Sequence, residues 1–323
     1  MHARERGTLS HTAETIRVAY KTDLGCMMQG TVEDLLDSSH LDGSRGKVNL
    51  ILTSPPFPLT TKKRYGNRNG EEYLKWMSEL APRLASLLAP DGSIVLEIGN
   101  AWLPGRPVMS TLPLETLLEF LRSSGLQLCQ QFVCHNSARL PGPAQWVNVE
   151  RIRVKDSYTH VWWMARTDRP KADNRNVLKE YGSEMRRLLK TRRYNSGRRP
   201  SGHVIQKETF FQNNGGAIPP NVLTFSNTAS FSNYLTFCRE RKLKLHPARM
   251  PIGLPEFFIK FLTAEGQLVM DPFAGSNTTG AAAEGLKRRW ISVEANEDYA
   301  EGSKGRFSQF SEKAKPDSRG KKR

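Results

Sequence analysis

The chain has 323 residues, and its 48 Lys and Arg against 32 Asp and Glu give a formal net charge of +16. This length accommodates one large α/β domain, with or without a smaller module, and no stretch approaches the roughly 20 apolar residues of a membrane span. Clustered basic residues favour a polyanionic partner, nucleic acid first, although ribosomal or membrane-surface binding would produce the same bulk charge. Residues 1–15 are polar without an apolar signal segment, so a flexible N-terminus and a cytoplasmic protein are expected.

The four cysteines show no pattern typical of metal binding. Cys26, Cys129, Cys134 and Cys238 are neither paired as Cys-x-x-Cys nor accompanied by His at zinc-ligand spacing. We therefore expect reduced cysteines in the core or in loops, and no metal site.

Hydrophobic periodicity predicts an α/β domain. The expected elements are, in chain order, a strand pair over 16–28, a helix from Thr31, a strand over 48–52, a helix over 71–88, a strand over 93–99, a helix over 112–122, strands over 126–134 and 158–164, a helix over 254–262, and a strand, helix and strand over 267–294. The run 48–52, aliphatic except for Asn49, lacks alternation, which indicates a mainly parallel sheet buried on both faces.

The stretch Thr53-Ser54-Pro55-Pro56-Phe57 follows the strand 48–52 directly, at the end where ligands bind in open α/β sheets. Two consecutive prolines fix φ twice and remove two N–H donors, which leaves carbonyl oxygens without intramolecular partners. Such a turn suits a planar ring with an exocyclic amine: Ser54 and the Pro55 carbonyl would accept from the amine, and Phe57 would stack on the ring. Because Pro-Pro is also ordinary loop punctuation, this stretch alone does not establish a site.

Two acidic residues stand out among the predicted elements. Asp34 lies three residues after Thr31, which predicts a helix-capping box. Glu97 interrupts the apolar strand 93–99 near its carboxyl end. Because burying an unpaired carboxylate is costly, Glu97 is expected to have a polar partner, an ion pair or an open cleft beside it.

The composition changes over residues 166–207, where 13 Lys or Arg stand against 4 acids and apolar residues are too few for a separate core. We predict a target-recognition region over 167–240 that becomes ordered on nucleic acid; a solvated insert is the alternative. The arginine pairs of this region are the predicted phosphate contacts, namely Arg186, Arg187, Arg192, Arg193, Arg198 and Arg199.

Residues 267–294 form a second candidate site. One strand ends at Asp271, a glycine turn follows, and the next strand ends at Glu294, 23 residues after Asp271. Such a βαβ unit brings a backbone turn close to a nucleoside cofactor and places a carboxylate on its ribose. A nucleoside triphosphate site is not expected, since Ala281 stands where a P-loop requires Lys.

These motifs resemble those of the amino-methylating DNA methyltransferases. Ser54-Pro55-Pro56-Phe57 is similar to the cytosine-N4 form of motif IV, and Asp271-Pro272-Phe273-Ala274-Gly275-Ser276 closely resembles motif I, the S-adenosylmethionine turn. The stretch His246-Pro247-Ala248-Arg249-Met250-Pro251 resembles motif X, and Arg139-Leu140-Pro141-Gly142-Pro143 resembles the motif VIII region beside the target base. This order is that of the β class, and the resemblance covers about residues 17–310.

The resemblance implies an S-adenosylmethionine-dependent enzyme that methylates the N4 amine of cytosine in duplex DNA after base flipping. Ser54, Pro55, Pro56 and Phe57 would be catalytic. The implied cofactor contacts are Asp271, Phe273, Ala274, Gly275, Ser276, Glu294, Thr53 and Asp34. The methyltransferase domain would comprise 16–166 and 241–310, with the DNA target-recognition region 167–240 inserted and a basic tail at 311–323.

The resemblance also implies a role in a restriction-modification system. The expected enzyme is a monomer of the bacterial cytoplasm that shares its recognition site with a restriction endonuclease without contacting it. Similarity to one family member implies the internal cytosine of CAGCTG as the target, which no residue here shows by itself. The alternatives are adenine-N6 methylation, methylation of RNA or of a protein glutamine, and a DNA-binding module without catalysis.

Overall fold

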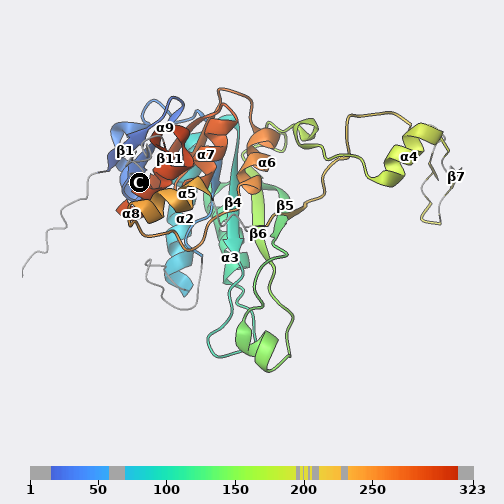
Figure 1. Cartoon of the computed structure of the whole chain (residues 1–323), viewed down its shortest axis with the longest axis horizontal. Coiled ribbons are helices and arrows are strands. Elements are labelled where there is room, and N and C mark those ends of the chain that lie inside the picture. Colours follow the sequence, from blue (N-terminus) through green and yellow to red (C-terminus); the bar gives the residue numbers. More distant parts are fainter. Residues whose placement is uncertain are drawn as a thin grey trace, which may run out of the picture.

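The computed structural model describes residues 16–57, 70–193, 197–198, 200–202, 204–205, 211–226 and 232–311. These residues are organised around a nine-stranded mixed sheet (Figure 1). Its strands lie in the order β1 (Arg17–Lys21), β2 (Gly25–Gln29), β11 (Arg289–Glu294), β10 (Leu268–Asp271), β3 (Val48–Thr53), β4 (Leu88–Gly99), β6 (Tyr158–Ala165), β5 (Gln127–His135) and β9 (Val222–Thr224). The pairs β1–β2, β4–β6 and β5–β6 are antiparallel and the other five are parallel. The predicted mainly parallel α/β sheet is therefore confirmed.

Helices cover both faces of the sheet. The described helices are α1 (Val32–Asp37), α2 (Gly70–Leu87), α3 (Leu112–Ser124), α4 (Ser183–Thr191), α5 (Asn233–Glu240), α6 (Gly253–Leu262), α7 (Thr278–Gly285), α8 (Glu297–Ser303) and α9 (Ser308–Ser311). Side chains of α1, α2 and α3 share one core cluster with Val48 and Ile51 of β3. Side chains of α6 and α7 share the other cluster with Leu50 and Leu52. Successive strand side chains point to opposite faces and helices cover both, so both faces of β3 are buried, which explains the consecutive aliphatic residues Leu50, Ile51 and Leu52.

The strand directions define two edges of the sheet. β10, β3 and β4 end together at what we call the carboxyl edge, with Asp271, Thr53 and Gly99 as their last residues. β6 runs antiparallel to β4 and begins at this edge, where Thr159 is paired with Gly99. The loop between β5 and β6 therefore emerges at the carboxyl edge, whereas the chain that follows β6 leaves from the opposite edge.

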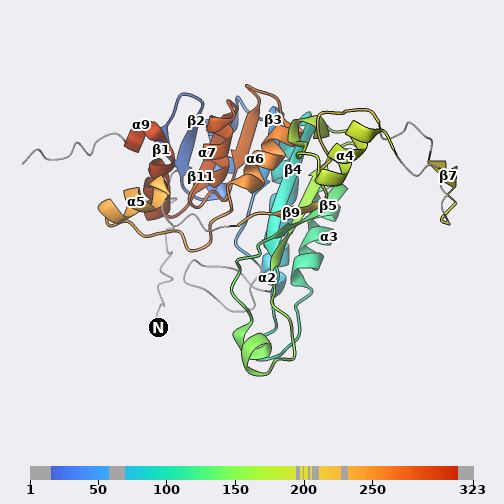
Figure 2. The same cartoon turned by 45° about the vertical axis from the view of Figure 1, so that its right-hand side comes forward.

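The predicted recognition region, 167–240, contains both separate and integrated parts. After β6 the chain contacts the body through the backbone N–H of Asp173, which donates to the Phe261 carbonyl at 2.8 Å, and then extends outward to α4 and the ribbon of β7 (Gly197–Arg198) and β8 (Val204–Ile205) (Figures 1 and 2). By contrast, β9 is a strand of the main sheet, and α5 packs beside α8 and the short helix η4 (Lys304–Arg306). The boundaries 167 and 240 stay a prediction.

Most elements predicted from periodicity are confirmed to within a few residues at each end. β4 is longer than expected and begins at Leu88, while β9, α4, α5 and α8 were not predicted from the sequence. The four cysteines are free, and Cys134 and Cys238 are buried. No helix among the described residues combines the length and the apolar character that crossing a membrane requires.

Candidate active site

The two motifs predicted from the sequence meet at the topological switch point of the sheet. β10 and β3 are parallel neighbours, and the chain proceeds from β10 to β11 on one side and from β3 to β4 on the other. The last residues of the two strands are joined, because the Thr53 hydroxyl donates a 2.6 Å hydrogen bond to the Asp271 carboxylate (Oδ1) and both residues are buried. In open α/β sheets this is the place where ligands bind.

The turn after β3 is held against the end of β4. Pro55 is buried, whereas Ser54, Pro56 and Phe57 are half-buried, so the turn is both supported and accessible. The Phe57 ring lies directly over Gly99: a Cβ built on Gly99 would be 2.5 Å from Cε2 of the ring. Gly99 is therefore required for the position of Phe57, a role that the sequence reading did not assign.

Glu97 lies behind this turn with only 7% of its surface exposed. Its Oε1 accepts a 2.8 Å hydrogen bond from the Thr159 hydroxyl, and the Ser54 hydroxyl also bonds to this carboxylate. Burial raises the pKa of Glu97, against the hydrogen bonds from Thr159 and Ser54 and the positive charge of Arg139. The polar partner expected for Glu97 is thus confirmed, and one of its partners is a predicted catalytic residue.

The turn after β10 presents backbone N–H groups instead of carbonyls. Gly275 adopts a left-handed conformation with φ +52°, and its N–H donates to Glu294 Oε2 at 2.8 Å. Glu294 Oε1 accepts from the N–H of Asn296 at 2.8 Å. Burial raises the pKa of Glu294, and these backbone hydrogen bonds oppose that effect. Glu294, the residue predicted to hold the ribose, therefore stands at the end of β11. The turn after β10, which we call the cofactor turn, orients its carboxylate.

Asp271 is oriented by the same turn. Its Oδ1 accepts from the N–H of Phe273 at 3.1 Å as well as from Thr53. Burial raises the pKa of Asp271 to about 6, against these hydrogen bonds. The structure therefore joins Thr53, Asp271 and Phe273, three of the residues predicted to contact the cofactor.

Two residues that the sequence reading missed support this turn. Asn277 is fully buried, adopts φ +54° as the N-cap of α7, and accepts from the Gly280 N–H at 3.1 Å and from the Ser292 hydroxyl at 2.7 Å. Arg306 donates to the Ser276 hydroxyl at 2.8 Å and to its carbonyl. Asn is one of the few non-glycine residues that tolerate this backbone region, which was the available signal for Asn277.

The donor set of this strand end fits a nucleoside cofactor, because the half-buried Glu294 carboxylate at the end of β11 can accept hydrogen bonds from ribose hydroxyls. Gly275 faces the His246 ring, and a Cβ there would be 2.9 Å from His246 Nε2, so the turn needs a residue without a side chain. His246 belongs to the stretch 246–251, which is thus placed over the turn, followed by the predicted helix α6. Ala274, which is buried, and Ser276 complete the turn beside Gly275.

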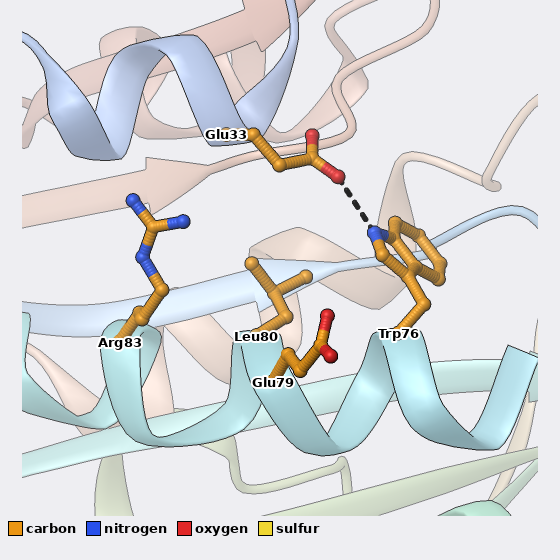
Figure 3. Close-up of a pocket in the computed structure, with 5 residues that line it drawn as sticks. All are labelled: Glu33, Trp76, Glu79, Leu80 and Arg83. Atoms are coloured by element: carbon orange, nitrogen blue, oxygen red, sulfur yellow. Dashed lines mark hydrogen bonds between the residues drawn. The ribbon is translucent and has the colours of Figure 1, made fainter.

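A small pocket lies next to the cofactor turn, between α1 and α2 (Figure 3). Its wall includes Trp76, whose indole N–H donates to Glu33 Oε1 at 2.7 Å. The same indole meets the Phe273 ring in an edge-to-face arrangement, with 5.5 Å between ring centroids. Neither Glu33 nor Trp76 was identified from the sequence, because both lie on helices whose periodicity indicates only packing.

Asp34 occupies the predicted helix cap. Its Oδ2 accepts from the Thr31 N–H at 3.1 Å and from the Thr31 hydroxyl at 2.6 Å, and its own N–H donates back to that hydroxyl at 3.1 Å. The capping box is confirmed, while the proposed cofactor contact of Asp34 stays a prediction.

The predicted phosphate contacts lie far from the carboxyl edge. Arg186, Arg187, Arg192, Arg193 and Arg198 are exposed on α4, just after it and on β7, in the segment that leaves the opposite edge of the sheet (Figures 1 and 2). Arg187 forms a 2.7 Å ion pair with Glu184 of the same helix. Arg199 lies outside the described residues. Their contact with DNA stays a prediction.

Among the residues that the structure describes, no group of three or more His, Cys, Asp or Glu side chains is arranged to hold a metal ion.

Comparison with known proteins identifies the family of this chain. A family model described as DNA methylase matches residues 48–305. The type II methyltransferase M.PvuII of Proteus hauseri is 42% identical over 291 residues, which cover 90% of this chain and 85% of the relative. The solved PvuII DNA methyltransferase (cytosine-N4-specific) matches with a TM-score of 0.72 and 37% identity over 90% of this chain and 88% of its own. The M1.HpyAVI–SAM complex shares the fold, with a TM-score of 0.51 and 18% identity over 88% of this chain and 98% of its own. The chain belongs to the DNA methylase family.

Proposed function

We propose that this protein transfers a methyl group from S-adenosylmethionine to the N4 amine of a cytosine in duplex DNA, as part of a restriction-modification system. The observation that carries the proposal is the meeting of the Ser54–Phe57 turn and the Asp271–Ser276 turn at adjacent strand ends, joined by the Thr53–Asp271 hydrogen bond. Family membership and the 42% identity to M.PvuII support it.

The turn Ser54–Phe57 binds the target base. Ser54 donates its hydroxyl hydrogen to Glu97, so the lone pairs of Ser54 Oγ remain available to accept from the cytosine amine. The Pro55 carbonyl accepts the second amine hydrogen, and the Phe57 ring stacks on the base. These contacts orient the nitrogen lone pair for an in-line transfer, in which positioning supplies much of the rate.

The cofactor turn binds the methyl donor. S-adenosylmethionine, when bound, supplies an electrophilic sulfonium methyl group. Glu294 would hold the ribose hydroxyls, and the N–H groups at the start of α7, near Ser276, would meet the carboxylate. The amine loses a proton on methylation, and Ser54 can pass it to Glu97, whose raised pKa favours accepting it. No covalent intermediate with the protein is required.

The cellular role, the oligomeric state and the DNA site are part of the same proposal. The enzyme would act as a cytoplasmic monomer on a site that a restriction endonuclease also recognises, with CAGCTG as the proposed site. Its target cytosine must leave the base stack, which costs a few kcal/mol. The Arg pairs of the 167–240 region would contact phosphates.

The test is incubation with labelled S-adenosylmethionine and two duplexes, one containing CAGCTG and one in which the same six bases are scrambled. Digestion to nucleosides should yield N4-methylcytosine from the first duplex only. N6-methyladenine would overturn the interpretation of Ser54 and Phe57, and equal labelling of both duplexes would overturn the proposed site. Binding of the cofactor and DNA without transfer to either duplex would favour a DNA-binding module.

A further inference from the structure

The loop between β5 and β6, residues 136–157, forms a projecting arm, which we call the β5–β6 arm. It extends beyond the carboxyl edge and ends in a single helical turn at Gln145–Val149 (green in Figures 1 and 2). The base of the arm lies beside the turn Ser54–Phe57, because Thr159 is paired with Gly99 and Gly99 contacts Phe57.

Hydrogen bonds within the arm give it a defined shape. At its base the Asn136 N–H donates to the Ser157 carbonyl at 2.8 Å, and further out the Asp156 N–H donates to the Gly142 carbonyl at 3.0 Å. At the tip the Ile152 N–H donates to the Trp146 carbonyl at 2.9 Å. The two sides of the arm are thus tied together along its length.

The arm is also fixed to the body of the protein. The Asn100 amide, immediately after β4, donates to Asp156 Oδ1 at 2.8 Å. The Arg153 guanidinium donates to the Pro107 carbonyl through Nε at 3.1 Å and Nη2 at 2.8 Å. The position of the arm is therefore set relative to the end of β4 and hence to Phe57.

Apolar side chains on this arm point into solvent. The exposed fractions are 83% for Leu140, 69% for Val149, 48% for Ile152 and 85% for Val154. Single exposed apolar residues are common on protein surfaces, but four on one short braced arm mark an interaction surface.

The charge of the arm favours a polyanion as the partner. Four cations, Arg139, Arg151, Arg153 and Lys155, stand against Glu150 and Asp156. Both acids accept hydrogen bonds from amides of the protein, Glu150 from Gln145 and Asp156 from Asn100. Arg151 is exposed near the tip and makes no hydrogen bond or ion pair with any residue that the structure describes.

We propose that the β5–β6 arm enters the DNA beside the target, so that its apolar side chains occupy the stack that the flipped cytosine leaves, while Arg151 contacts a neighbouring phosphate. Apolar wedges of this kind compensate for lost base stacking. The inference rests on the proposed function, and it places this contact at the carboxyl edge, away from the Arg pairs of α4.

The test uses the full-length variant Val149→Ser/Ile152→Ser/Val154→Ser with two duplexes, one with guanine and one with an abasic site opposite the target cytosine. An unpaired base needs less help to leave the stack. We expect kcat/KM on the paired duplex to fall about 10- to 100-fold, since the wedge offsets part of the unstacking cost. Most of this loss should disappear on the abasic duplex. The matched control, Leu114→Ser/Leu118→Ser on the exposed face of α3, should behave as wild type on both duplexes.

Wild-type activity of the triple variant on the paired duplex, or an equal loss on both duplexes, would overturn the proposal. So would a wild-type protein that is a dimer and a triple variant that is a monomer, because the arm would then be a self-association surface. If the triple variant loses cofactor binding, the single variants Val149→Ser and Val154→Ser provide the same comparison. Failure of the proposed function is distinguishable, because the wild-type protein would then methylate neither duplex.

Discussion

The turns that follow β3 and β10 lie at adjacent strand ends, yet they present opposite hydrogen-bonding groups. After β3, two prolines remove N–H donors, and the turn offers the Pro55 carbonyl and the Ser54 hydroxyl as acceptors. After β10, Gly275 in a left-handed conformation directs its N–H into the turn, towards Glu294. The first turn would thus face the donor hydrogens of the base amine, whereas the second turn fixes an acceptor, the Glu294 carboxylate, for the ribose. The Thr53–Asp271 hydrogen bond holds the two together.

This comparison predicts that the two turns can be damaged separately. The largest effect is expected from Ser54→Ala, which removes the hydroxyl that accepts from the target amine. The rate constant kcat should fall about 10²- to 10⁴-fold, the usual contribution of a positioned proton-transfer group, while the Kd of S-adenosylmethionine stays near the wild-type value. Single-turnover kinetics and cofactor titration measure the two quantities.

Ser86→Ala is the matched control for Ser54→Ala, since Ser86 is an exposed serine on α2 whose hydroxyl donates to the Arg83 carbonyl of the same helix at 2.6 Å. It should leave both quantities unchanged. Equal loss of transfer and of cofactor affinity in Ser54→Ala would contradict the division between the turns.

Gly275→Ala should produce the converse result. The added Cβ meets His246 Nε2 at 2.9 Å, and φ +52° is unfavourable for alanine by about 1–2 kcal/mol. We expect the Kd of S-adenosylmethionine to rise about tenfold or more, with a smaller change in kcat at saturating cofactor.

Gly266→Ala controls for backbone strain, because Gly266 has φ +77° and nothing lies within 4 Å of its Cβ position. It should reduce stability slightly without changing the Kd. A Gly275→Ala protein with wild-type cofactor affinity would remove this turn from the cofactor site.

We expect the salt dependence of DNA binding to come from the arginines at the end of α4 and from neither turn. If Arg192 and Arg193 neutralise two phosphates, Arg192→Ala/Arg193→Ala should reduce the slope of log K against log salt by about 1.8. Both kcat and cofactor affinity should stay unchanged. Lys75→Ala/Arg122→Ala removes two exposed charges from α2 and α3 and serves as the control. An unchanged slope in the first variant would exclude these arginines from the phosphate contacts.

The smallest expected effect concerns the bond between the turns. The pKa of Asp271 is raised by burial from 3.8 to about 6, so its stabilising contribution is complete below pH 3.8 and disappears as the pH rises through about 6. Asp271→Asn keeps an acceptor oxygen for Thr53 and cannot ionise. The free energy of unfolding of the wild type should therefore fall relative to the variant by about 1 kcal/mol between pH 5 and pH 8. Urea unfolding at both pH values measures this difference, and a pH-independent difference would contradict the raised pKa.

The sequence predicted the sheet and both turns because each is encoded locally. Consecutive aliphatic residues such as Leu50, Ile51 and Leu52 identify strands, while proline restricts the backbone at a strand end and glycine permits a left-handed turn there, whatever surrounds them. The capping box of Thr31 and Asp34 was predicted for the same reason. Gly99, Trp76 and Arg306 were missed because their roles depend on Phe57, Phe273 and Ser276, which are remote in sequence and become neighbours only in the folded chain.

The amino-acid sequence by itself determined the class of fold, the two motifs and the resemblance to amino-methylating enzymes, since local backbone chemistry suffices for these. Tertiary structure decided which motifs meet: it bonded Thr53 to Asp271 and placed Ser54 on the buried Glu97. It also placed the basic helix α4 far from the carboxyl edge, whereas the β5–β6 arm projects from that edge. Strand order and direction cause this, because antiparallel β6 reverses the edge at which the following chain emerges.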